Sequence, residues 1–334
     1  MTTHTETMGP VSTMREVAQA LRAASSVVVA THENPDGDAI GSARAAELVL
    51  NAAGLDVLVH VPGNVVPREY ASISPSSMIS GIPDDIGSRV VVCIDCGNAS
   101  RIANAELLER AAQVINIDHH ADNSHFGDLN VVIGSAACST LLVRELAREL
   151  DISVTADMAK AIYIGLVTDT GRFQYSNTNP EAFALAAEMV HCGADIHQVF
   201  REVYESLDYQ RVKLLGLGLG NARQHDGGRV VSTHLTRADF DAAGADDDDA
   251  EGIVDFLRAT VGTHVAVFVR DLKQGSAFAR KGSLRTTRDD VDVSVIARTW
   301  SGGGHRQAAG FSTDDSMEEI VARVVAGLSA QQER

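Results

Sequence analysis

The first side chains with recognisable chemistry follow a short apolar run. Residues 27–30 are all valine or alanine, and His32, Asp36 and Asp38 come directly after them, with a proline and a glycine between. Such a run is typical of a buried parallel strand, and proline and glycine are typical of the turn that ends one. One imidazole and two carboxylates on one turn are ligands suited to a divalent metal ion. The sequence therefore predicts a metal site where this strand ends.

Two later stretches repeat the pattern. Residues 90–94 are apolar and precede Asp95, and residues 114–117 precede the triplet Asp-His-His at 118–120. Ligands of open α/β sheets bind beyond the carboxyl ends of the strands. Three strands that end in acids or histidines therefore predict one shared site.

A fourth acid follows a stretch with a different pattern. Residues 161–168 are largely apolar and lead into Asp169, and the preceding residues 155–160 suit the start of a helix. We therefore expect Asp169 at the end of a helix.

The elements that must position these side chains alternate between strand and helix. This alternation predicts a parallel sheet with helices on both faces, and so an α/β fold for the N-terminal domain. The expected strands are residues 27–31, 56–61, 90–94 and 114–117, and the expected helices are residues 14–24, 39–53, 103–110, 136–150, 155–168 and 180–192.

The remaining chain predicts a linker and a smaller α/β domain. We expect domain boundaries at 1–194, 195–226 and 227–334, with the middle segment mostly helical. The expected elements of the last segment are a strand at 229–235, a hairpin of strands 263–270 and 275–281, a helix at 291–299, a glycine loop at 302–304 and a helix at 316–329.

Composition limits the classes of protein that fit. The chain has 334 residues, which is long enough for two domains with separate cores. Its residues are 45% hydrophobic and 4% aromatic, a composition typical of soluble globular proteins. No apolar run approaches membrane-span length, and the N-terminus lacks a signal-peptide pattern. Four cysteines without framework spacing favour a reducing compartment, so we expect a cytoplasmic protein.

The net charge disfavours a protein that binds long nucleic acids. The net charge is −17, whereas such proteins usually carry a basic stripe. Residues 270–306 nevertheless hold eight Arg or Lys and only four Asp. A short anionic substrate therefore fits this chain better than a polymer or a membrane does.

At this point the four motifs resemble the DHH phosphoesterase superfamily, in order and spacing, over residues 12–190. Ser-Leu-Arg at 283–285 and the stretch Gly-Gly-Gly-His-Arg-Gln-Ala-Ala-Gly at 302–310 resemble its DHH-associated substrate-binding domain. Ser301 stands where the family usually has a first glycine. The strongest resemblance is to NrnA-type bacterial enzymes, which act on short oligoribonucleotides, on 3′-phosphoadenosine 5′-phosphate and, in actinobacteria, on cyclic di-AMP or its linear product.

The resemblance implies two divalent ions, with manganese as the expected metal. Asp95 is the carboxylate expected to bridge them. The implied ligands are His32, Asp36 and Asp95 for one ion, and Asp38, Asp95, His119 and Asp169 for the other.

The same resemblance implies roles for residues around the ions. We expect His120 to contact the scissile phosphate or assist the leaving group, Asn34 to touch the phosphate or bridging water, and Asp118 to orient a ligand histidine or a loop amide. The expected substrate-binding residues are Arg285, Gly303, Gly304, His305 and Arg306.

The sequence therefore favours a manganese-dependent phosphoesterase that cleaves short oligoribonucleotides, cyclic di-AMP or 3′-phosphoadenosine 5′-phosphate to mononucleotides. Family resemblance also implies a homodimer. Three alternatives stay open: an inorganic pyrophosphatase, a single-strand exonuclease of the same superfamily, and a nucleotide sensor without activity.

Overall fold

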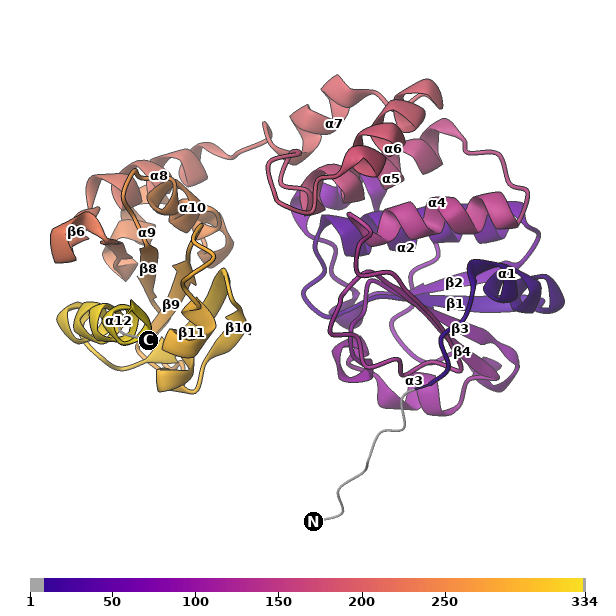
Figure 1. Ribbon diagram of the computed structural model, residues 1–334, viewed down its shortest axis with the longest axis horizontal. Coiled ribbons are helices and arrows are strands. Elements are labelled where there is room, and N and C mark those ends of the chain that lie inside the picture. Colours follow the sequence, from indigo (N-terminus) through magenta and orange to yellow (C-terminus); the bar gives the residue numbers. More distant parts are fainter. Residues whose placement is uncertain (1–8, 333–334) are drawn as a thin grey trace, which may run out of the picture. The chain divides into compact units, whose positions relative to one another are not determined.

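The structure of the chain is a computed structural model that describes residues 9–332, apart from the side chain of His305. The chain divides into two compact units, with unit 1 ending at Ser206 and unit 2 beginning at Leu207 (Figure 1). Each unit has its own β-sheet. Among the described residues, no helix is long and apolar enough to cross a membrane.

Unit 1 contains a five-stranded sheet in the order β2-β1-β3-β4-β5, and all of its neighbouring strands are parallel. Valine-rich runs form the strands, because β-branched side chains suit a pleated backbone covered on both faces. The strands are β1 Ser26–Ala30, β2 Asp56–His60, β3 Val90–Ile94, β4 Gln113–Asp118 and β5 Leu129–Val132.

Helices cover both faces of this sheet, as predicted. Val27 and Val29 of β1 pack into a large core with the long helices, whereas Val28 packs on the opposite face with Ile102 and Leu107. The helices of unit 1 are α1 Met14–Ala23, α2 Gly37–Ala52, α3 Ala105–Glu109, α4 Ser139–Glu149, α5 Ala156–Asp169, α6 Pro180–His191 and α7 Ile196–Val203, with short 3-10 turns that include η3 Ile86–Ser88 and η4 Ala99–Ile102.

The register of the sheet brings three strand ends to one edge. Ala30 of β1 lies beside Cys93 of β3, and Ile94 of β3 lies beside Ile117 of β4. The residues that follow these strands therefore meet at the carboxyl edge. Asp169 is the last residue of α5, which confirms the prediction that it ends a helix.

Unit 2 contains a six-stranded mixed sheet in the order β10-β11-β9-β8-β7-β6. The predicted hairpin is present, because β8 and β9 pair antiparallel, but its second strand is Arg280–Arg285 rather than the predicted 275–281. The residues of the predicted linker form α7, α8 and β6, and the predicted domain boundaries stay predictions. The elements of unit 2 are α8 Tyr209–Gly220, β6 Arg223–His225, β7 Val230–Leu235, α9 Arg237–Ala243, η6 Asp247–Ala250, α10 Ile253–Arg258, β8 Val265–Asp271, β9 Arg280–Arg285, α11 Val293–Ala297, η7 Arg298–Trp300, β10 Gly303–His305, β11 Ala308–Thr313 and α12 Met317–Gln332.

The glycine-rich stretch differs from its prediction as a loop. Gly303–His305 forms strand β10, which pairs antiparallel with β11. Gly304 has φ +138°, and a Cβ atom there would lie 2.5 Å from the carbonyl oxygen of Ala308. The absence of a side chain at Gly304 thus lets β10 and β11 approach each other closely. Glycine is also common in loops, so the glycine content of this stretch does not distinguish a strand from a loop.

Trp300 and Ser301 occupy the turn before β10. The Trp300 ring stacks on Phe311 at 4.0 Å between centroids, and its indole N–H donates to Asp315, so it packs within unit 2. Ser301 has φ +59°, a left-handed conformation that glycine adopts most easily. The serine therefore keeps the turn that a glycine would form.

Candidate metal centre

The structure brings all six predicted metal ligands together at the carboxyl edge of the unit 1 sheet. Three groups of side chains each place their ligand atoms within 4.8 Å of one another, and together they contain all six. Mixed imidazole and carboxylate donors suit divalent cations. The groups are His32, Asp36 and Asp95; Asp38, His119 and Asp169; and Asp95, His119 and His120.

Asp95 stands between the first two groups. Its Oδ2 atom lies 3.6 Å from Nε2 of His32, and its Oδ1 atom lies 3.6 Å from Nε2 of His119. These separations are too long for hydrogen bonds, and they suit ligand atoms that share an ion at about 2.0–2.2 Å from each. Asp95 also has φ +59°, an unfavourable conformation for a residue with a side chain and one that clusters at functional sites.

Backbone carbonyl groups set the tautomers of the two predicted histidine ligands. Nδ1 of His32 lies 2.7 Å from the Glu33 carbonyl oxygen, and Nδ1 of His119 lies 3.3 Å from that of Ala136. A carbonyl oxygen only accepts, so each Nδ1 carries the proton. Each Nε2 then presents its lone pair to the carboxylates, which is the form that a metal ligand requires.

Two helix starts hold the carboxylates of the first motif. Oδ1 of Asp36 accepts from the backbone N–H groups of Asp38 and Ala39, both at 3.0 Å, and so caps α2. The Asp38 carboxylate accepts from the backbone N–H groups of Ser139 at 2.6 Å and Thr140 at 3.1 Å, at the start of α4. Helix N-termini favour negative charge, so both carboxylates are fixed in orientation.

The electrostatics of the cluster favour added cations. Burial, followed by the charges of Asp95 and Asp169, raises the pKa of Asp38 well above its usual value. Burial also raises the pKa of Asp169 to about 7, against the opposing effect of His119. Burial acts to raise the pKa of Asp95, but the direct polar contact with His32, followed by the effects of His119 and His120, outweighs it and lowers this pKa to about 2. Divalent ions would relieve this crowding of carboxylates, so the residues present fit them.

His120 is oriented by Asp118 rather than by the metal ligands. Its Nδ1 donates to Oδ1 of Asp118 at 2.8 Å, and this hydrogen bond raises the pKa of His120 to about 9. Asp118 is fully buried and also accepts from the side-chain amide of Asn123. Asp118 was expected to orient a ligand histidine or a loop amide, and the histidine that it contacts is His120, which is not among the predicted ligands. A positively charged imidazole therefore lies beside the carboxylates.

Ser139 and Asn177 contact the predicted ligands but were not predicted themselves. The Ser139 hydroxyl donates to Oδ1 of Asp95 at 3.0 Å, and the Asn177 amide donates to Oδ2 of Asp169 at 3.2 Å. Serine and asparagine are frequent at helix starts and in loops, so neither residue had a signal in the sequence. Asn34 lies in the metal-binding turn with φ +52° and an exposed side chain, and its predicted role stays a prediction.

The predicted substrate-binding residues lie in unit 2. Arg285 ends β9, and its guanidinium donates to the backbone oxygen of Leu284 at 3.0 Å. Arg306 is exposed and donates to the backbone oxygen of Asp289. Gly303 and Gly304 belong to β10, as does the backbone of His305, whereas the His305 side chain lies outside the described part of the chain. Register places Arg285 beside Ala308 of β11, so Arg285 and the β10–β11 turn share one end of the sheet.

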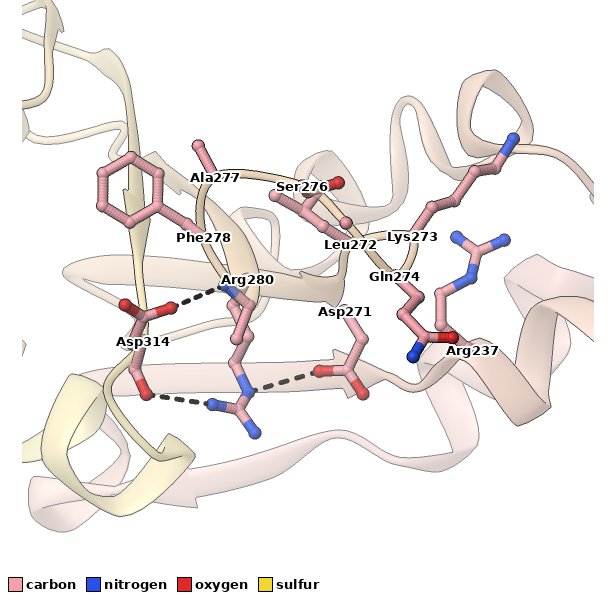
Figure 2. A pocket seen from close by; sticks show the side chains of 12 residues that line it. Arg237, Asp271, Leu272, Lys273, Gln274, Ser276, Ala277, Phe278, Arg280 and Asp314 are labelled. Carbon is pink, nitrogen blue, oxygen red and sulfur yellow. Dashed lines mark hydrogen bonds and ion pairs between the residues drawn. The ribbon is translucent and has the colours of Figure 1, made fainter.

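Two cavities of about 440 Å³ in unit 2 involve other residues. One lies at the turn between β8 and β9 (Figure 2), and the other lies against β6, β7 and α12. In the first, Arg280 pairs with Asp271 at 3.2 Å and Arg237 pairs with Asp247 at 2.5 Å. Carboxylates already neutralise these cations, and neither cavity is lined by the predicted substrate-binding residues. Asp247 is thus partly buried and paired.

Comparison with known proteins identifies both units. The chain matches the DHH family, N-terminal domain, over residues 26–166 and the DHHA1 domain over residues 228–330. It is 34% identical over 322 residues to the bifunctional oligoribonuclease and PAP phosphatase NrnA of Thermus thermophilus, a match that covers 93% of each chain. The protein of the same name in Bacillus subtilis is 27% identical, over 89% of this chain and 92% of the relative.

Solved structures agree with this fold. An exopolyphosphatase-related protein from Bacteroides fragilis matches with a TM-score of 0.83 at 23% identity, over 96% of both chains. The exonuclease RecJ bound to manganese matches with a TM-score of 0.52 at 16% identity, over 97% of this chain and 96% of that chain. Together with the sequence matches, the shared fold confirms the resemblance seen in the motifs. The chain belongs to the DHH/DHHA1 family of phosphoesterases, and it is a hydrolase of phosphoester bonds.

Proposed function

We propose that this phosphoesterase cleaves short oligoribonucleotides and 3′-phosphoadenosine 5′-phosphate to mononucleotides with two manganese ions. The observation that carries the proposal is Asp95, whose two oxygens face His32 on one side and His119 on the other. Relatives that match over about nine-tenths of both chains are named for these two activities. The manganese in RecJ supports the choice of metal by analogy of fold.

Each ion has its own set of side chains in this proposal, and Asp95 belongs to both. When bound, two such ions activate a water molecule and stabilise charge on the phosphate oxygens. The protein fixes the ligand geometry in advance, through the helix starts at Asp36 and Asp38 and the carbonyl groups behind the histidines. The proposed ligands are His32, Asp36 and Asp95 in the first set, and Asp38, Asp95, His119 and Asp169 in the second.

His120 is the proposed proton donor or phosphate contact. Asp118 holds its Nδ1 and keeps the ring protonated, so Nε2–H is available to a phosphate oxygen or a leaving group. Asn34 is the proposed second polar contact in the turn. In unit 2, Arg285, His305 and Arg306 are proposed to bind the nucleotide, with Arg suited to phosphate through its paired donors.

Cyclic di-AMP and its linear product pApA extend the proposal. Both contain two AMP units joined by phosphodiester bonds, so they present the same scissile group as a short oligoribonucleotide. We also propose a homodimer and a cytoplasmic location. The location is supported by Cys93, Cys96, Cys138 and Cys192, which are all free thiols.

The deciding experiment measures product release with each substrate in parallel. Protein stripped with chelator and reloaded with manganese should release AMP from pApA, and phosphate from 3′-phosphoadenosine 5′-phosphate. Cyclic di-AMP is assayed under the same conditions to place it in or outside the substrate range. Preference for pyrophosphate, or processive digestion of long single-stranded DNA, would replace the proposal with another phosphoesterase activity. Nucleotide binding without any turnover would reject it in favour of a sensor.

A further inference from the structure

Arg101 places a guanidinium group at the metal centre that the predicted site does not include. It belongs to η4, Ala99–Ile102, shortly after Asp95, and its Nη2 atom lies 3.0 Å from Nδ1 of His32. The backbone of the same turn is fixed, because the Arg101 carbonyl oxygen accepts from Glu33 N–H at 2.8 Å. Ile102 is fully buried. The turn therefore holds the guanidinium beside the first predicted ion.

Within the described residues, the structure records no carboxylate partner for Arg101. Several other arginines of unit 1 are paired, among them Arg89 with Asp56 at 2.6 Å and Arg110 with Glu106 at 2.7 Å. Among the described residues, the hydrogen-bond contact recorded for the Arg101 side chain is the ring nitrogen of His32. Within the described part of the chain, its guanidinium is thus not held in a recorded ion pair, and it lies next to a site that we propose to bind anionic substrates.

The tautomer of His32 leaves the Arg101 donor without an acceptor. Nδ1 of His32 lies 2.7 Å from the Glu33 carbonyl oxygen, which can only accept, so this nitrogen carries the proton. Nε2 then has the lone pair and faces Asp95, as a metal ligand must. In that tautomer, which leaves Nε2 free for a metal ion, Nδ1 cannot accept from Nη2 of Arg101, which lies 3.0 Å away. A guanidinium N–H group without an acceptor is stabilised when it donates a hydrogen bond to an anionic oxygen.

We propose that Arg101 binds a non-bridging oxygen of the scissile phosphate. This inference rests on the proposed phosphoesterase function, and it adds a phosphate-binding residue in unit 1 beside His120. Two divalent ions neutralise the four aspartates of the centre, so a bound phosphodiester brings net negative charge. The guanidinium supplies the compensating charge at the phosphate that every substrate shares. Arg285 and Arg306, in contrast, are proposed to contact the nucleotide.

The test compares Arg101→Gln and Arg101→Lys with the matched control Arg110→Gln, which also removes one positive charge from unit 1 but lies in an exposed ion pair. For Arg101→Gln, kcat/KM should fall roughly 10- to 100-fold on both pApA and bis(p-nitrophenyl) phosphate. Arg101→Lys should recover part of the loss, and the control should match wild type. Calorimetry should give about tenfold weaker binding of inorganic phosphate, with manganese affinity and Tm unchanged.

Two results would overturn the assignment. Wild-type turnover by Arg101→Gln would remove Arg101 from substrate binding. Weaker manganese binding with unchanged phosphate affinity would make it a positioning residue for His32 instead. The phosphate titration also separates this inference from the proposed function: a wild-type protein that hydrolyses neither substrate would reject the function, whereas Arg101 would still be judged by phosphate affinity.

Discussion

The metal centre of unit 1 and the predicted substrate-binding residues of unit 2 are built in opposite ways. Asp38 and Asp95 are at most 2% exposed, and each accepts a hydrogen bond from Ser139 of α4. The hydrogen bonds that the structure records for the Arg285 and Arg306 side chains are to backbone oxygens, of Leu284 and Asp289. One region is fixed before anything binds, whereas the other keeps most of its donors available.

The difference follows from what each region has to bind. A small multivalent cation needs several ligand atoms at fixed short distances, so its ligands must be oriented by other bonds. A nucleotide is larger and anionic, and arginine can meet its phosphate with whichever donors are uncommitted. Loss of a ligand in unit 1 should therefore abolish chemistry for every substrate. Loss of an arginine in unit 2 should change selectivity.

The largest effect is expected for Asp95→Asn. The variant keeps the shape of the side chain but removes the charge that faces both ligand sets, so kcat should fall by roughly 10³-fold or more on all substrates. Manganese titration should give fewer bound ions than wild type. Circular dichroism and Tm serve as folding controls. Full activity in a folded variant would contradict the assignment of two ions.

Gly165→Ala, a substitution within α5, should disturb the metal centre. A Cβ atom on Gly165 would lie 2.4 Å from Cγ2 of Thr140 and 2.7 Å from Oδ1 of Asp38. We expect a stability loss of about 1–3 kcal/mol from overpacking, and activity reduced by roughly tenfold or more through displacement of Asp38. Thermal unfolding and kcat measure the two effects.

Gly216→Ala is the matched control, because Gly216 is also inside a helix but has no atom near its Cβ position. There the substitution should stabilise the protein by about 0.5–1 kcal/mol, through higher helix propensity, and leave activity unchanged. If Gly165→Ala behaved in the same way, close packing between α2, α4 and α5 would not be what positions Asp38.

Arg306→Gln should separate substrate selection from chemistry. We expect kcat/KM on pApA to fall by roughly tenfold, with less than a twofold change on bis(p-nitrophenyl) phosphate, which has no nucleoside. Arg223→Gln provides the control, because Arg223 lies on β6 at the other edge of the same sheet and also bonds to a backbone oxygen. Equal losses on both substrates would place Arg306 at the reacting phosphate and erase the contrast between the units.

The smallest effect is expected for Ser301→Gly. Ser301 and Asp95 both have φ +59°, but only Asp95 carries a side chain that the metal centre needs. Glycine at 301 should relieve strain and raise the free energy of unfolding by about 0.5–1 kcal/mol. Denaturant unfolding measures this gain. A destabilised variant would mean that the Ser301 side chain has a structural contact of its own.

Strands and helices could be predicted where a continuous stretch of sequence carries their residue pattern. Runs such as residues 90–94 are apolar at every position, so their burial between helices could be expected. β5 was missed because Leu129–Val132 is short and contains Asn130, whose amide bonds to the backbone of Pro10 and Gly127. β10 was missed because glycine has low strand propensity, and only the pairing with β11 makes it a strand.

The sequence by itself determined the ligand types, their order and the strand ends that carry them, because each motif follows directly from its own apolar run. It thereby determined the class of chemistry. Only the tertiary structure decided that Ser139 and Thr140 hold Asp38, that Asp118 holds His120, and that Arg101 lies beside His32. With the exception of Asp118 and His120, these contacts join residues many positions apart. Their geometry depends on the register of the sheet and the packing of α2 and α4, which no local pattern encodes.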